Sequence, residues 1–491
     1  MLREHYRNAS FIAVAGLIAR LKGLILLPFL TRHLGALDFG IWSQLTVIVS
    51  VFAPLIVLGT DSGSIRYLPQ QADKKQLSYY SALFVFVLGM SFFGAIGIIS
   101  FDHQIVFLFL DDGEAHVRFI PLVVASMIVT ILSNMNLRWF LIRNDGLSHS
   151  IVTVLQAIVS AITVTYALFF SLEIYDLVLL TVAADGVLVL LVIVAILVRD
   201  GVVSPDFAIL HKIVFFGLPL LPSAYAMLGL NLMDRIFLVR YTSIAEIGMY
   251  SLAYGVGMII VPMLAKPFRN MFPAMMVKLH ARGDVEGMQL LFNHSAGVVF
   301  GLLLPAVVGL FLVGEPLIAV LGPPEFSPAA YLLGIVAASY SLSTLNNYFD
   351  ICLSIAHRQV WTTYIIVLAC TVNLVFNMLL IPGYGIWGAA IATLIAFVAR
   401  FLATLIVSYN YWLFKLSIMF VLRVIISCSV MAFIVFLFKC IFELKSGSPF
   451  VGLFIMVFIG GGAYGVMLLI TEVISFRDLR SFLCKVMSKV A

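Results

Sequence analysis

The chain has 491 residues, of which 63% are hydrophobic and only 11% are charged, and its mean hydropathy is +1.12. Globular soluble domains carry about 25% charged residues, so this composition excludes a soluble protein and predicts many membrane-spanning helices. The apolar runs do not alternate as the strands of a membrane barrel do. The net charge of +5 is not gathered into a basic tract, so no nucleic-acid partner is expected.

The cysteines give no sign of a disulfide framework or a metal site. There are five, Cys352, Cys370, Cys428, Cys440 and Cys484, and none forms a C-x-x-C pair. Neither a metal nor another cofactor is expected. The N-terminal segment MLREHYRNAS leads straight into the first apolar run. We interpret that run as a retained anchor, because too little apolar sequence precedes the cleavage-like Ala13-Val14-Ala15.

Apolar runs of about twenty residues follow one another with short breaks, and each is long enough to cross a bilayer as a helix. The fold class predicted from this pattern is an all-α polytopic membrane protein with about 14 transmembrane helices. The expected spans lie at roughly residues 9–30, 39–59, 77–100, 117–142, 150–171, 174–198, 212–240, 247–272, 291–320, 329–355, 361–380, 385–410, 419–442 and 449–473.

Lysine and arginine in the connections predict the orientation of the chain. With a cytoplasmic N-terminus, the inner connections hold sixteen of these cations and the outer connections hold five. The outer connection at 102–114 is acidic instead. Because cytoplasmic loops are enriched in cations, and the span count is even, both termini of this multi-pass protein are expected to be cytoplasmic.

An internal repeat with an offset of 208 residues relates the two halves of the chain. Phe29–Ser43 (FLTRHLGALDFGIWS) aligns with Phe237–Ser251 (FLVRYTSIAEIGMYS), and Phe, Leu, Arg, Gly and Ser coincide. Each repeat then holds six spans and starts on the same side of the membrane, as in transporters built from parallel repeats. The repeat predicts six-helix bundles at 1–211 and 212–411, followed by two appended helices and a cytoplasmic tail at 412–491.

Two cations lie in the middle of the first span. Arg20 is about ten residues from either end, and a cation at the bilayer centre costs from ~3 to more than ~10 kcal/mol. Arg20 and Lys22 are therefore expected to meet an anionic group, either a bound substrate or a buried acid. They lie about 200° apart on a helix, and Arg20, which shares its face with Gly16 and Gly23, is the stronger candidate.

Further cations lie in later spans. Lys266 and Arg269 are three residues apart on one face of the eighth span, and they either bind an anion or reach the headgroups. Arg400 lies deep in the twelfth span, where a binding role and a structural role are both open. Arg138, beside Trp139, is expected to be an anchor at the inner interface.

Three acids lie within spans and are candidates for ion or proton coupling. Asp185 is in the middle of the sixth span, Asp350 is in the inner half of the tenth, and Asp234 is in the seventh beside Arg235. An acid in a membrane span either neutralises a buried cation or carries a proton or an ion. For Asp234 the structural role is favoured, and for the other two both roles stay open.

One late motif resembles a known superfamily. The segment Asn373–Thr393, with the pattern N-x-x-x-N-x-x-x-I-P-x-Y-G-I-x-G-A-A-x-A-T, is similar to polysaccharide exporters of the multidrug/oligosaccharidyl-lipid/polysaccharide superfamily. LTRHLGALDFGIWSQ, LGTDSGSIRY and GLPLLPSAYAMLGLNLMDRIFLVR agree with this resemblance. The chain looks most like the Wzx-type flippases of O-antigen and capsule repeat units.

The resemblance implies two six-helix bundles around a central cavity and a flippase that works by alternating access. Its substrate would be an undecaprenyl-diphosphate-linked oligosaccharide for surface polysaccharide, such as the O-antigen of lipopolysaccharide. The resemblance further implies a cationic cavity, which Arg20, Lys22, Lys266, Arg269 and Arg400 fit. It also implies a bacterial or archaeal cytoplasmic (inner) membrane, contact with membrane lipid, H+ or Na+ as a coupling ion, and the polysaccharide polymerase and assembly proteins as partners.

Two related functions are kept as alternatives: a lipid II flippase, with the same chemistry on a peptidoglycan precursor, and a cation-coupled multidrug exporter. The exporters of this superfamily use acidic residues in the first span, and this first span has none. An enzyme is not expected, because glycan polymerases and glycosyltransferases need an aqueous loop with an acid or nucleotide site. The longest connections here have about 18 residues and hold no such constellation.

Overall fold

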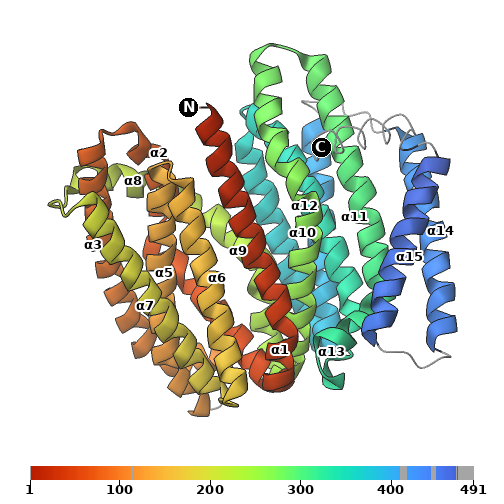
Figure 1. Ribbon diagram of the computed structural model, residues 1–491, viewed down its shortest axis with the longest axis horizontal. Coiled ribbons are helices and arrows are strands. Elements are labelled where there is room, and N and C mark those ends of the chain that lie inside the picture. The colour runs from red at the N-terminus through yellow and green to blue at the C-terminus, as the bar shows by residue number, and fades with distance from the viewer. Residues whose placement is uncertain (1, 112–113, 410–416, 444–448, 472, 474–491) are drawn as a thin grey trace, which may run out of the picture. The chain divides into compact units, whose positions relative to one another are not determined.

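The computed structural model describes residues 2–111, 114–409, 417–443, 449–471 and 473, and all elements in these ranges are helical (Figure 1). The first part of the chain forms α1 (Leu2–Val57), α2 (Thr60–Tyr67), α3 (Asp73–Ser100), α4 (Asp102–Phe109), α5 (Ile120–Ile142), α6 (Gly146–Phe169), α7 (Ile174–Asp200), α8 (Leu210–Gly217) and α9 (Leu221–Tyr241). The later part forms α10 (Ile244–Ala281), α11 (Val285–Leu321), α12 (Ala329–Ile355), α13 (Gln359–Tyr409), α14 (Ile418–Glu443) and α15 (Pro449–Ile470). Short 3₁₀ turns lie at Leu68–Gln70, Glu114–Phe119, Phe207–Ile209, Leu218–Leu220 and Pro324–Phe326.

The helices α1 and α13 are each two helices joined at a glycine. Gly35 has φ 68° and Gly385 has φ 52°, both in the left-handed region that glycine adopts without steric cost. Gly35 falls in the predicted break between residues 30 and 39, and Gly385 is the first residue of the predicted span 385–410, directly after the break that follows residue 380. Each long helix therefore contains two of the predicted spans.

Among the described residues, eleven helices are long and apolar enough to cross a membrane. Two of them, α1 and α13, contain two spans each, and α12 is a further 27-residue helix at the predicted tenth span. Counted in this way the described chain has fourteen spans, and the predicted all-α polytopic fold is confirmed. The α12 helix carries three polar residues in its second half, Asn346, Asn347 and Asp350.

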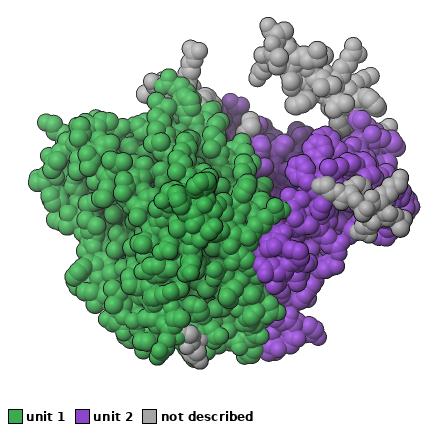
Figure 2. Space-filling view, turned by 60° about the horizontal axis from the view of Figure 1, so that its bottom comes forward, with its two compact units in different colours: residues 1–248 green, residues 249–491 purple. Residues whose placement is uncertain are grey.

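The chain divides into two compact units, residues 1–248 (unit 1) and residues 249–491 (unit 2) (Figure 2). Within unit 1, α1 packs on α5 and α6, and α7 packs on α5 and α6. Within unit 2, α12 packs between α11 and α13. The units divide at a different residue from the predicted bundles, whose boundaries at 211 and 411 stay a prediction.

A close backbone contact in unit 1 follows the internal repeat. A methyl group on Gly40 would meet the carbonyl oxygen of Ile244, and one on Gly248 would meet the carbonyl oxygen of Ala36. The 208-residue offset relates Ala36 to Ile244 and Gly40 to Gly248. The contact is therefore reciprocal, as it is between two segments related by a two-fold axis.

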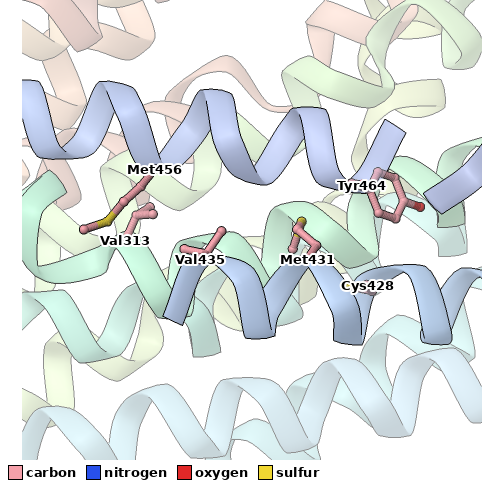
Figure 3. Packing of buried hydrophobic residues seen from close by; sticks show 6 residues of the cluster. All are labelled: Val313, Cys428, Met431, Val435, Met456 and Tyr464. Atoms are coloured by element: carbon pink, nitrogen blue, oxygen red, sulfur yellow. The ribbon is translucent and has the colours of Figure 1, made fainter. Parts of the chain in front are cut away.

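The last two helices pack on α11 within unit 2. Figure 3 shows the side chains that join them: Val313, Cys428, Met431, Val435, Met456 and Tyr464. The Tyr464 hydroxyl donates to the carbonyl oxygen of Gly301 at 2.6 Å, and Lys439 Nζ lies 2.5 Å from Glu315 Oε2. The appended pair is thus fixed to α11 by an apolar seam, a hydrogen bond and an ion pair.

The late sequence motif has a structural role in α13. Asn377 Nδ2 donates to Asn373 Oδ1 at 3.0 Å, and Asn373 Nδ2 donates to Thr393 Oγ1 at 3.3 Å. All three residues are buried, so the bonds join the two halves of α13 across the Gly385 kink in an apolar surrounding.

Candidate functional site

Unit 2 contains a cavity of about 590 Å³ between α10 and α12. It is lined by Arg269, Pro273, Asn347, Asp350, Ile351 and Ser354. This cavity is wide open to its surroundings. Two residues that the sequence selects independently, Arg269 and Asp350, both line it.

The α12 side of the cavity is one face of a helix. Asn347, Asp350, Ile351 and Ser354 are spaced by three and four residues, so their side chains lie on the same side. Asn346 lies on a neighbouring face and donates from Nδ2 to Asp350 Oδ2 at 3.2 Å. A polar face of this kind in a membrane span is a sequence signal that points to a water-filled or ligand-filled space.

The α10 side of the cavity is shaped by prolines. Pro262, Pro267 and Pro273 lie inside α10, and each lacks the N–H that a helix interior uses. Arg269 falls between the last two of them, and it lines the cavity. Lys266, one turn earlier, is half-buried on the same helix but does not line the cavity.

Arg400 reaches the cavity through Asp350. The guanidinium of Arg400, on α13, lies 2.9 Å from Asp350 Oδ2. The Arg400 side chain is 4% exposed, and the Asp350 side chain is 19% exposed at the cavity. The sequence leaves open whether Arg400 and Asp350 are structural, and the structure shows that they neutralise each other.

The charges around this cavity favour an anion. Arg269 and Arg400 contribute two positive charges, and Asp350 is the one acid among the lining residues. A guanidinium presents planar N–H donors that match phosphate and carboxylate oxygens in pairs. The arrangement therefore suits a phosphate-containing group, with the Asp350 carboxylate as an internal competitor for Arg400.

The charges of the first span lie apart from this cavity, in unit 1. Lys22 Nζ donates to Ser160 Oγ on α6 at 3.0 Å. Asp185, on α7, is close enough to Lys22 for an electrostatic interaction. Arg20, Lys22 and Asp185 are all half-buried.

Asp234 is 1% exposed on α9, and its Oδ1 accepts a hydrogen bond from the backbone N–H of Arg235 at 2.8 Å. The structural role that the sequence favours for this acid stays a prediction. Asp234 belongs to unit 1, so the structure groups the three candidate acids into two sets.

Sequence reasoning missed several charged pairs in unit 1, and one of them involves the predicted anchor Arg138. Arg138, expected to be an interfacial anchor, forms an ion pair with Asp61 on α2, and Trp139 beside it is fully buried. The Trp139 Nε1 donates to Asp200 Oδ2 at 2.8 Å. The sequence did contain a sign of this pair. Asp61 is a lone acid in the LGTDSGSIRY stretch that follows the second span, so it could have been considered as a partner for Arg138.

A family model described as "Polysaccharide biosynthesis protein" matches residues 6–279, which is more than half of the chain. The chain belongs to this polysaccharide biosynthesis protein family. The predicted resemblance to the exporter superfamily is therefore confirmed.

This family member is 22% identical over 400 residues to the uncharacterized membrane protein MJ1068 of Methanocaldococcus jannaschii, a match that covers 74% of this chain and 75% of that protein. It is 24% identical over 254 residues to the probable low-salt glycan biosynthesis flippase Agl15 of Haloferax volcanii. The second match covers 50% of this chain and 52% of that protein, so it spans about half the length of that relative.

Two solved structures are similar to the fold of this family member. The lipid II flippase MurJ, in an inward closed conformation, matches with a TM-score of 0.77 at 14% identity, over 95% of this chain and 99% of that chain. An inward-facing multidrug resistance MATE family transporter matches with a TM-score of 0.60 at 14% identity, over 83% of this chain and 94% of that chain. At these identities the likeness shows a common fold.

Proposed function

We propose that the protein is a flippase that moves an undecaprenyl-diphosphate-linked oligosaccharide repeat unit across the cytoplasmic membrane for surface polysaccharide biosynthesis. Membership of the polysaccharide biosynthesis protein family and the similarity to a probable glycan biosynthesis flippase support this assignment. The observation that carries it is the cavity of about 590 Å³ in unit 2, where two arginines face one acid.

The diphosphate is the part of the substrate that this cavity recognises. Arg269 donates to the phosphate oxygens from the α10 side, and Arg400 donates when the substrate displaces Asp350 from its guanidinium. Because Asp350 competes for Arg400, the diphosphate is held strongly enough to bind and weakly enough to leave. The prenyl chain stays in the lipid, and alternating access exposes the cavity first to one side of the membrane and then to the other.

The remaining charges complete the proposal. Arg20 and Lys22, in unit 1, and Lys266, in unit 2, are further candidates for binding the anionic substrate. If transport is coupled to H+ or Na+, an acidic side chain has to bind and release that ion. The candidates are Asp350, Asp185 and Asp234, in that order. The site of action is the bacterial or archaeal inner membrane, next to the polysaccharide polymerase and assembly proteins.

The test is complementation of a strain that lacks this protein, with surface polysaccharide as the readout. Hydrogen bonds to a charged group contribute about 1.5–3 kcal/mol, so Arg269→Ala is expected to weaken substrate binding about 10- to 200-fold. Arg20→Ala should also lower export, and Arg269→Lys should keep part of the activity. Lys278→Ala, an exposed cation on the same α10 helix outside the cavity, is the matched control.

Mass spectrometry of the accumulated lipid identifies the substrate directly. The proposal predicts a lipid-linked oligosaccharide diphosphate that accumulates in the deletion strain and in the Arg269→Ala strain. Rescue of cells depleted of their own lipid II flippase would favour that activity instead. Dye export that does not need Arg20 or Arg269 would favour a multidrug exporter, and full polysaccharide in the Arg269→Ala and Arg20→Ala strains would refute the assignment.

A further inference from the structure

Unit 1 contains a cavity of about 200 Å³ between the second half of α1, α5 and α7. It is partly open to its surroundings, and leucine and valine side chains form much of its wall. No charged side chain is among the described residues that line it. Its polar lining consists of the Trp42 indole and the hydroxyl groups of Thr46, Ser50, Ser126, Thr130 and Thr181. The cavity therefore combines an aromatic face with five uncharged hydroxyls.

Three of these hydroxyls are bonded within their own helices. Thr46 donates to the Trp42 carbonyl oxygen at 3.1 Å, and Ser50 donates to the Thr46 carbonyl oxygen at 2.8 Å. Thr181, on α7, donates to the Leu177 carbonyl oxygen at 2.8 Å. Serine and threonine in membrane helices commonly bond to the carbonyl one turn earlier. Since a hydroxyl oxygen has two lone pairs, all three can still accept a hydrogen bond from a ligand in the cavity.

The two hydroxyls on α5 are different. Ser126 and Thr130 lie one turn apart on the face of α5 that lines the cavity, and both side chains are half-buried. Within the described part of the chain, the structure shows no hydrogen bond from either hydroxyl. A hydroxyl that faces hydrocarbon without a partner lowers stability. Both donors are thus available to a ligand that carries oxygen atoms, whereas a lipid chain in the cavity would leave them unpaired.

Trp42 supplies the aromatic wall of the cavity. The 208-residue offset relates it to Tyr250, which is fully buried and packs on the Tyr254 ring at 4.3 Å in unit 2. Trp42 is instead half-buried at the cavity. The same repeat position therefore belongs to the core in unit 2 and to a cavity wall in unit 1. An indole offers a broad apolar face and one N–H donor, which suits a ligand with one apolar face and a polar edge.

The predicted orientation places this cavity in the outer half of the membrane. The spans at roughly 39–59, 117–142 and 174–198 each begin on the outer side. The lining residues of α1, α5 and α7 lie between this outer end and the middle of each span. A group bound here would lie in the part of the membrane that an exported headgroup crosses last.

We propose that this cavity is a subsite for one neutral sugar ring of the transported glycan, an inference that rests on the proposed flippase function. The C–H face of the ring stacks on the Trp42 indole. Oxygen atoms of the sugar accept from Ser126 and Thr130, and its hydroxyls donate to Thr46 and Ser50. Because no charged residue lines the cavity, a uronic acid or a diphosphate finds no counter-ion there. The subsite thus recognises the glycan, and it shares no residue with the cavity between α10 and α12.

The test is saturation-transfer NMR on the full-length protein in lipid nanodiscs that are free of glycoside detergent. The probes are the methyl α-glycosides of glucose, galactose and N-acetylglucosamine. We expect saturation transfer to at least one of them. Ser126→Ala/Thr130→Val removes two hydrogen bonds at nearly constant volume, so it should weaken binding about 5- to 100-fold. Trp42→Leu keeps an apolar side chain but removes the stacking face, and it should also weaken binding.

The matched control is Ser429→Ala/Thr165→Val, which removes two exposed hydroxyls that bond to carbonyls of their own helices, α14 and α6. It should bind the glycosides as the wild type does. Unchanged binding in both Ser126→Ala/Thr130→Val and Trp42→Leu, or no binding of any probe by the wild type, would overturn the proposal and leave the cavity to lipid chains or water.

Failure of the flippase function would give a different result. A wild-type protein that does not restore surface polysaccharide in the deletion strain would refute the proposed function. Binding of the glycosides in nanodiscs needs no transport, so its dependence on Trp42, Ser126 and Thr130 would still decide whether the cavity holds a sugar.

Discussion

The pair formed by Arg400 and Asp350 combines a structural role with a proposed binding role. Removing one partner of a buried ion pair leaves the other charge without compensation, which typically costs about 3–5 kcal/mol. Arg400→Met should therefore lower the thermal unfolding midpoint in detergent markedly. The double variant Asp350→Asn/Arg400→Met should recover much of this loss, because no uncompensated charge remains.

Arg269→Ala is the control for that experiment, because Arg269 lines the same cavity without belonging to the ion pair. It should leave the unfolding midpoint nearly unchanged while it lowers transport. If Arg400→Met and Arg269→Ala were equally stable, the ion pair would contribute nothing to the fold. The comparison thus separates the stability of unit 2 from the chemistry of its cavity.

Asp145 gives a pH-dependent prediction outside the membrane spans. It caps α6: its carboxylate accepts from the Ser148 N–H at 3.0 Å and from Arg199 Nη1 at 2.7 Å. Burial opposes ionisation, but the bonds from Ser148 and Arg199 outweigh it and lower the pKa of Asp145. A lowered folded pKa contributes stability above the unfolded value of about 3.9 and loses it as the pH falls through the folded value.

Asp145→Asn is the variant that tests this prediction, because asparagine is also a good helix cap but carries no charge. The wild-type protein should be more stable near neutral pH by at most about 1 kcal/mol, since the pair with Arg199 is partly exposed. This advantage should shrink as the pH falls below about 4. A difference in unfolding midpoint that is the same at both pH values would contradict the assigned role.

At this scale, the sequence identifies charged residues better than it identifies their partners. Arg269, Asp350 and Arg400 could be selected because a charge in a membrane span is costly, and the structure brings them together. The partners of Lys22 and Arg138 could not be predicted. They lie on helices more than 75 residues away in the chain, and hydropathy carries no information about which faces of these helices meet.

At the scale of elements, the reciprocal contact of Gly40 and Gly248 is a constraint on helix packing. A side chain at either position would meet a backbone carbonyl, which cannot move as the end of a flexible side chain can. We expect Gly40→Val and Gly248→Val to lower the yield of folded protein and its unfolding midpoint. Overpacking of this kind costs about 1–3 kcal/mol or more.

Gly89→Ala is the matched control, because nothing lies within 4 Å of a methyl group built at that glycine in α3. It should be neutral or stabilising, since alanine is a better helix former than glycine by about 0.5–1 kcal/mol. Equal effects of the valine variants and of Gly89→Ala would show that the close approach is not needed. Comparing these variants therefore separates the effect of the close backbone contact on stability from the effect of helix propensity.

The elements themselves were predicted well, because span length and apolar runs are fixed by the bilayer. The kink at Gly35 falls in a predicted break between apolar runs, and the kink at Gly385 falls directly after one. The short helices α2 and α4 were not predicted, since each has only eight residues and lies in a connection. The α8 helix is also short, and it forms the start of the predicted span 212–240 as a separate helix. The polar face of α12 was visible in the sequence as Asn347, Asp350 and Ser354, but only Asp350 was selected.

At the scale of the whole molecule, the internal repeat and the compact units describe different properties. The repeat records the relation between Phe29–Ser43 and Phe237–Ser251, whereas the units record which helices pack together. The segment 212–248 belongs to the second repeat by sequence and to unit 1 by packing. A duplicated chain can therefore place a boundary of packing some distance from the boundary of its repeat, which sequence alignment alone does not reveal.

Orientation in the membrane is the remaining whole-molecule property on which the proposed transport direction depends. The excess of lysine and arginine predicts that Lys75 faces the cytoplasm and that Glu114, in the acidic connection, faces outside. Both side chains are exposed, so cysteine at either position should react with a thiol reagent. Both cysteine variants are made in a protein in which serine replaces two native cysteines. These are Cys440, which is exposed, and Cys484, which lies in the predicted cytoplasmic tail.

In intact cells an impermeant reagent should label Glu114→Cys and should label Lys75→Cys only after permeabilisation. The α10–α12 cavity would then receive its substrate from the leaflet that faces the cytoplasm, where lipid-linked glycans would have to be loaded for export. The reverse labelling pattern would place the inner connections outside. In that case the protein would have to transport its substrate in the opposite direction, and the proposed export function would be wrong. The proposal that the cationic cavity binds a diphosphate would not be affected.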